Sequence, residues 1–118
     1  MQQVDPSGIF QLGMGYWASK VLLSAVKLGV FTALAAGPLT GEELEARLGL
    51  HPRATYDFLD ALVALRMLDR SGTGRDARYR NTPETDHFLD REKSSYVGGR
   101  LEMANDRLFR FWADLDTA

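Results

Sequence analysis

The sequence of 118 residues contains no cysteine and only two histidines, His51 and His87. The lack of cysteine excludes disulfide bonds, thiolate nucleophiles and cysteine-based zinc sites, and it is compatible with a reducing cytosol. With so few histidines and no His-x-x-x-His pair, we expect no metal site in this chain.

The chain also lacks an excess of positive charge and a long uninterrupted apolar stretch. Its 14 lysine and arginine residues face 16 aspartate and glutamate residues, for a net charge of -2, so we expect no nucleic acid as a partner. The most apolar stretch, 21–36, is interrupted by Ser24, Lys27 and Gly29, and it does not predict a membrane span. The first six residues do not resemble a secretory signal, and we expect a cytoplasmic location.

A glycine-rich turn between a strand and a helix, which nucleotide and methyl-donor sites need, is missing as well. The glycine pairs at 13 and 15 and at 98 and 99 follow no apolar strand, and the pair at 72 and 74 lies inside an expected hairpin. The adjacent Asp86 and His87 have no third group at a spacing typical of a nucleophile with its base. We therefore expect no catalytic residue and no bound cofactor in this chain alone.

The first clear helical pattern starts between Gly8 and Gly15 and ends at Gly29, a typical C-cap glycine. Apolar side chains cover most of its circumference, and polar ones form only a narrow stripe. A helix that is apolar nearly all round needs partners on more than one side, and we expect a second copy of the chain to be one of them. A short helical continuation is expected over 30–34.

The middle of the chain has the pattern of a helix-turn-helix followed by a hairpin. Thr40 and Glu43 form a capping-box pattern for a helix that buries Leu44, Ala46 and Leu48 and ends at Gly49. A second helix is expected from Pro52 to about Leu68. The glycine-centred loop over 69–80, flanked by short extended segments, predicts a β-hairpin wing.

After Thr82-Pro83, a short helix is expected over 85–89, and a last helix from Ser94 or Tyr96 to Asp116. The sequence therefore predicts one mainly α domain over 1–118, a winged helix-turn-helix with a small hairpin wing and extra helices at both ends. Its parts are N-terminal dimerisation helices over about 1–36, the winged helix-turn-helix over 38–83, and C-terminal helices over 84–118.

A winged helix invites a DNA-binding interpretation, so we examined the presumed recognition helix. Its outward stripe carries Arg53, Asp57, Asp60 or Ala61, and Ala64, by helical spacing. Two aspartates of this helix would therefore face the phosphates of DNA. The mild excess of arginine in the expected hairpin wing fits a solvated hairpin better than a DNA contact. A DNA-binding transcriptional regulator remains the alternative.

Four blocks of the sequence, 26–34, 40–49, 59–65 and 79–83, follow one another in an order that resembles the N-terminal domain of S-adenosylmethionine-dependent O-methyltransferases. The resemblance is to bacterial enzymes that methylate polyketide and other aromatic natural products, and more distantly to plant caffeate-type enzymes. One departure is Arg66-Met67-Leu68, which stands where the family usually has a glycine before the wing strand.

The resemblance implies a homodimer in which the N-terminal helices of two subunits interlock and help to close the substrate pocket. It implies S-adenosylmethionine as the cofactor of a parent enzyme whose catalytic domain is expected beyond Ala118, and an aromatic small molecule as the methyl acceptor. A freestanding dimerisation module that acts in trans is a further alternative.

The resemblance also implies two sets of site residues. The residues expected to line the substrate pocket are Tyr16, Trp17, Met103, Asn105, Leu108, Phe109 and Trp112. The residues expected at the dimer interface are Trp17, Val21, Leu22, Ala25, Leu28 and Phe31.

Overall fold

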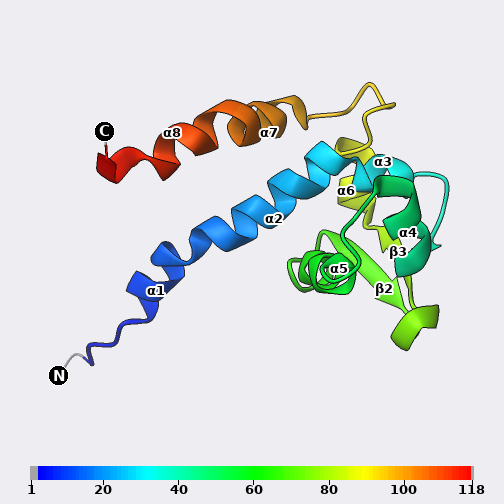
Figure 1. Ribbon diagram of the computed structural model, residues 1–118, viewed down its shortest axis with the longest axis horizontal. Helices are drawn as coiled ribbons and strands as arrows, with labels where there is room; N and C mark the ends of the chain where they lie inside the picture. The colour runs from blue at the N-terminus through cyan, green and yellow to red at the C-terminus, as the bar shows by residue number, and fades with distance from the viewer. Residues whose placement is uncertain (1–2, 118) are drawn as a thin grey trace.

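A computed structural model describes residues 3–117 as a mainly helical chain with one small antiparallel sheet (Figure 1). None of the helices within these residues is long and apolar enough to cross a membrane. In chain order the elements are α1 (Ser7–Gly13), α2 (Gly15–Leu28), α3 (Val30–Ala33), β1 (Leu39–Thr40), α4 (Gly41–Leu48), α5 (Thr55–Ala64), β2 (Leu68–Ser71), the 3-10 turn η1 (Gly74–Asp76), β3 (Arg78–Asn81), α6 (Pro83–Phe88), α7 (Gly99–Met103), the π-helical turn η2 (Ala104–Leu108), α8 (Phe109–Ala113) and the 3-10 turn η3 (Leu115–Thr117).

The caps that the sequence predicts for α2 and α4 are confirmed. Gly29 adopts the left-handed conformation with φ 80°, and its N–H donates to the carbonyls of Ala25 and Val26 at 3.1 and 3.2 Å. At α4, the hydroxyl of Thr40 accepts from the Glu43 N–H at 3.2 Å, and the Glu43 carboxylate accepts from the Thr40 N–H at 3.0 Å. Such local bonds satisfy helix-end groups without help from the rest of the fold.

Two helix starts and one buried position were predicted wrongly. Residues 52–54 form a turn, so α5 begins at Thr55 rather than at Pro52, and it ends at Ala64 rather than near Leu68. The last helix begins at Gly99, because residues 89–98 form a connection of turns and bends. Ala46 is exposed, since α4 turns its other side toward the core.

The three strands form a sheet in the order β1-β3-β2, with both pairs antiparallel. The β2–β3 hairpin confirms the predicted pair of extended segments, whereas β1, only two residues long, was not predicted. Tyr79 lies at the centre of the sheet, opposite Leu39 on one side and Arg70 on the other. Its side chain is buried, and it anchors the sheet to the helices.

The hydrophobic core lies where α2, α3, α4 and α5 meet this sheet. The buried side chains of the cluster are small and branched apolar groups with one phenylalanine and one tyrosine, which is the composition of a well-packed interior. They are Ala25, Val26, Val30, Phe31, Leu34, Leu44, Leu59, Leu62, Leu68, Tyr79 and Leu89. The core therefore uses the C-terminal half of α2 but not its N-terminal half.

The two ends of the chain extend away from this core (Figure 1). Segments α7 and η2 run back along α2 and pack against it, and both termini lie at the end of the molecule that is far from the sheet. The radius of gyration of the Cα atoms is 16.3 Å, whereas a compact domain of this length has a value of about 13.5 Å. The accessible surface is 8582 Å², against about 6,400 Å² for a folded monomer of this mass.

Candidate functional site

The first uncovered surface is formed by α1 and the start of α2. Helix α1 has no buried residue, and its Leu12 is 84% exposed. We call the set of large exposed side chains in this part of the chain the N-terminal apolar surface: Ile9, Phe10, Leu12, Met14, Tyr16 and Trp17. Single exposed apolar residues are normal, but six within nine positions form a contiguous patch of the kind that marks an interaction site.

A groove runs along α2 beside α5, and we call it the α2–α5 groove. It consists of two adjoining hollows of about 220 and 210 Å³ that share Ser24 and Phe58. The hollow near the N-terminal half of α2 is lined in addition by Tyr16, Trp17, Lys20 and Val21, and the other by Leu28, Leu50, Ala54 and Thr55. Apolar walls with a few polar groups are typical of sites that bind small organic molecules.

Lys20 connects this groove to the returning C-terminal segment. Its ammonium donates a hydrogen bond to Oδ1 of Asn105, which is buried in η2, and lies 5.0 Å from the centre of the Phe109 ring. A cation over an aromatic face is attracted by the ring's quadrupole. The contact therefore fixes both η2 and the start of α8 against α2.

The C-terminal segment carries the second large uncovered surface. Phe111 and Trp112 are 72% and 69% exposed, and Leu115 is exposed as well. An open hollow of about 490 Å³ lies along this segment, lined by Asp106, Arg107, Arg110, Phe111, Asp114 and Thr117. So many large apolar side chains on one terminal segment need a cover in the working protein.

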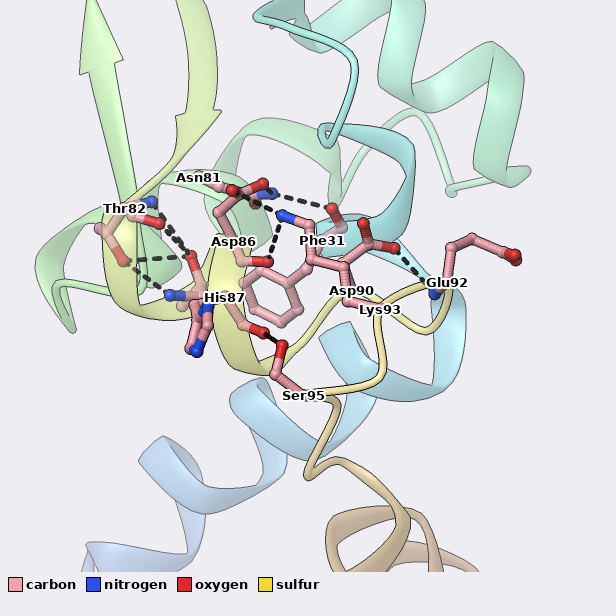
Figure 2. A network of polar contacts seen from close by, with 10 residues as sticks. Phe31, Asn81, Thr82, Asp86, His87, Asp90, Glu92, Lys93 and Ser95 are labelled. Atoms are coloured by element: carbon pink, nitrogen blue, oxygen red, sulfur yellow. Dashed lines mark hydrogen bonds and ion pairs between the residues drawn. The ribbon is translucent and has the colours of Figure 1, made fainter.

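A polar network holds the connection between the sheet and α7 in place (Figure 2). Asn81 donates from Nδ2 to the carbonyl of Phe31 at 2.9 Å, and the Lys93 ammonium lies 2.7 Å from Oδ2 of Asp86. The hydrogen bond from Lys93 is the main reason why the pKa of the Asp86 carboxyl is lowered. Thr82 caps α6 through a capping box with Thr85.

Arg91 completes this connection at the C-terminal end of α2. Its Nη2 donates to the carbonyls of Val26 at 2.6 Å and Lys27 at 3.1 Å, and lies 2.9 Å from Oε1 of Glu102 in α7. A positive charge at the end of a helix satisfies unpaired carbonyls and interacts favourably with the helix dipole. Arg91 thus links the C-terminal end of α2 to α7.

The structure brings together only part of the predicted substrate-facing set. Tyr16 and Trp17 line the groove directly, and Asn105 and Phe109 contact the Lys20 side chain that lines it. The remaining members do not line the α2–α5 groove and are exposed: Met103, Leu108 and Trp112.

Two of the predicted dimer-interface residues need correction. Ala25 and Phe31 are 0% and 1% exposed within the single chain, so neither offers surface to a partner. Trp17 and Leu28 are exposed, while Val21 and Leu22 are partly buried against the core. The correction arises because helical periodicity shows which side chains are apolar but not whether the chain's own core already covers them.

Sequence reasoning missed Lys20 as part of the groove, and it placed α1 within the expected dimerisation helices without singling out its side chains. Lys20 was grouped with the narrow polar stripe of the helix, and only its position one turn after Tyr16 and Trp17 could have placed it in the groove. The side chains of Ile9, Phe10 and Leu12 were visible as a short apolar segment before α2.

Comparison with known proteins gives this arrangement a family. The sequence model of the O-methyltransferase dimerisation domain matches residues 10–91. The chain is 50% identical over 113 residues to the tetracenomycin polyketide synthesis 8-O-methyl transferase TcmO of Streptomyces glaucescens, covering 96% of this chain and 32% of that protein. It is 44% identical over 111 residues to the N,N-dimethyltransferase OxyT of Streptomyces rimosus, covering 93% of this chain and 31% of the relative.

Solved structures show the same arrangement. Human N-acetylserotonin methyltransferase in complex with SAM superposes with a TM-score of 0.86 at 27% identity, covering 99% of this chain and 35% of that chain. The chain thus spans about a third of the length of the relatives that it matches. With the family match over most of its length, the chain belongs to the O-methyltransferase dimerisation domain family.

Proposed function

We propose that the chain forms a homodimer in which the N-terminal apolar surfaces of two copies interlock. The observation that carries this proposal is the accessible surface of 8582 Å², which exceeds that of a folded monomer of the same mass by about 2,200 Å². This excess on one chain is larger than the about 800 Å² that each partner contributes to an interface of standard size. Covering α1 with a second copy would remove its exposed apolar side chains from water.

The middle of the chain serves as the rigid scaffold for this dimer. We interpret α4, α5 and the β2–β3 hairpin as a winged helix, with α5 in the place of a recognition helix. DNA binding is the weaker interpretation because Asp57 is exposed on α5, and because Asp60 on the same helix pairs with Arg70 of the wing at 3.0 Å. These carboxylates would repel a phosphate backbone.

The α2–α5 groove and the exposed apolar side chains of the C-terminal segment supply one wall of an acceptor pocket in a larger enzyme. That enzyme is an S-adenosylmethionine-dependent O-methyltransferase, and its acceptor is an aromatic or polyketide hydroxyl. The names of two relatives support this class, since one acts in tetracenomycin polyketide synthesis and another, from Streptomyces sahachiroi, on 3-hydroxy-5-methyl-1-naphthoate. The wall would orient the acceptor and exclude water from methyl transfer.

Donor binding and catalysis belong to a separate domain, either continuous with this chain or supplied in trans. Titration of the chain with S-adenosylmethionine in a calorimeter is expected to give no binding heat. A saturable heat would contradict this division of roles.

Sedimentation velocity on aspartate variants tests the proposed interface. Phe10→Asp places a charge in the N-terminal apolar surface and is expected to shift the dimer to monomer at tens of micromolar protein. Val4→Asp is the matched control, because Val4 is 95% exposed and lies before α1. Equal sedimentation of the two variants and the wild type as dimers would place the interface elsewhere.

A further inference from the structure

Lys20 is the one side chain with a formal charge at pH 7 among the described residues that line the α2–α5 groove. It lines the same hollow as the aromatic side chains of Tyr16, Trp17 and Phe58. Its side chain is partly buried. An ammonium in such a place has lost part of its hydration, so any anion that reaches it interacts more strongly than at an open surface.

The partners of Lys20 within residues 3–117 leave this charge uncompensated. Its hydrogen-bond acceptor is the neutral amide of Asn105, and its other neighbour is the Phe109 ring. The carboxylate of Asp106, the residue after Asn105, lies 3.4 Å from the ammonium of Lys27. None of the five ion pairs within residues 3–117 includes Lys20. A charge with only neutral partners is a good match for a charged ligand group.

We propose that Lys20 binds the carboxylate of a planar aromatic ligand whose ring lies against Tyr16 and Trp17 in the α2–α5 groove. A single ammonium is a point charge and fits a monoanionic carboxylate, whereas phosphate groups are usually held by several donors or by the fork of an arginine. This inference rests on the proposed role of the groove as a wall of the acceptor pocket. It makes Lys20 the residue that selects acidic aromatic acceptors over neutral ones.

Calorimetric titration of the full chain with a matched ligand pair tests this proposal. The probes are 2-naphthoate, which is anionic at pH 7, and 2-naphthol, which has the same rings and is neutral. We expect the wild type to bind naphthoate about tenfold more tightly, since a charge-assisted hydrogen bond replaces a neutral contact. The preference should decrease as salt is added, which a purely structural lysine would not produce.

Variants assign the preference to one side chain. Lys20→Gln is expected to bind both probes equally, Lys20→Arg to keep the preference, and Lys27→Gln, on the same helix, to behave as the wild type. A wild type that binds both probes equally, or a Lys20→Gln variant that keeps the preference, would overturn the role of Lys20 while leaving the pocket wall intact. If neither probe binds the wild type, both the pocket wall and this inference fail, whereas the dimer is judged separately by sedimentation.

Discussion

Replacing Arg66 by glycine is expected to stabilise the protein. Arg66 is the one non-glycine residue with positive φ within residues 3–117, at 63°. Its N–H donates to the carbonyl of Val63 at 2.9 Å, and the Met67 N–H donates to that of Leu62 at 2.9 Å. These two bonds form a Schellman motif at the end of α5, and the left-handed position of this motif is usually occupied by glycine.

The expected gain follows from two opposing effects. The left-handed conformation costs an L-residue about 1–2 kcal/mol because its Cβ crowds the following carbonyl. Glycine removes that cost but loses about 0.5–1 kcal/mol more conformational freedom on folding. The Arg66 side chain is exposed and has no hydrogen bond or ion pair with the described residues, so nothing else is lost. We expect a net gain in the free energy of unfolding of about 0.5–1 kcal/mol.

Urea denaturation at a fixed protein concentration measures this gain, because self-association makes apparent stability depend on concentration. Arg66→Ala is the matched control, since it removes the side chain but keeps the Cβ, and it should change stability by a few tenths of a kcal/mol at most. Gly49→Ala, at the corresponding position after α4 where φ is 69°, should destabilise by about 1 kcal/mol. A loss of stability in Arg66→Gly, or an equal gain in Arg66→Ala, would refute the reasoning.

Three further predictions concern stability. Arg91→Ala should lower the free energy of unfolding by about 1–3 kcal/mol, because it removes the hydrogen bonds from Arg91 to the carbonyls of Val26 and Lys27 and the ion pair with Glu102; an unchanged urea midpoint would contradict this. Gly41→Ala should destabilise, because its Cβ would lie 2.7 Å from the Tyr56 ring, and adding Tyr56→Ala should reverse the loss. Burial, with the Asp60 hydrogen bond, raises the pKa of Tyr79 to about 12. The stabilisation of the fold by the protonated Tyr79 hydroxyl is therefore complete below pH 10 and is lost as the pH rises toward 12. The decline in the free energy of unfolding over this pH range should be smaller in Tyr79→Phe.

The parts of the fold that could be predicted from sequence are those fixed by neighbouring residues. The left-handed glycines after α2 and α4, Gly29 and Gly49, and the capping box of Thr40 and Glu43 need only local backbone geometry. The β2–β3 hairpin likewise follows from a glycine-centred loop. These features therefore appear in the sequence as short, readable patterns.

The parts that could not be predicted depend on residues far apart in the chain. Strand β1 exists because Leu39 pairs with Tyr79 across the fold, and its two residues carry no strand pattern of their own. The connection over 89–98 is held by Arg91, whose partners in α2 lie 64 and 65 positions away. For the same reason, sequence spacing could not separate Ala25, which the chain buries by itself, from Trp17, which it leaves exposed.

Small-angle X-ray scattering from the chain in solution tests the central claim of self-association most directly, because it measures mass and size together. The account predicts a scattering mass twice the 13.2 kDa of one chain, with a radius of gyration above the 16.3 Å of the single copy. The mass of one chain at tens of micromolar protein, with a radius near 16.3 Å, would show that the apolar surfaces remain uncovered and would contradict it.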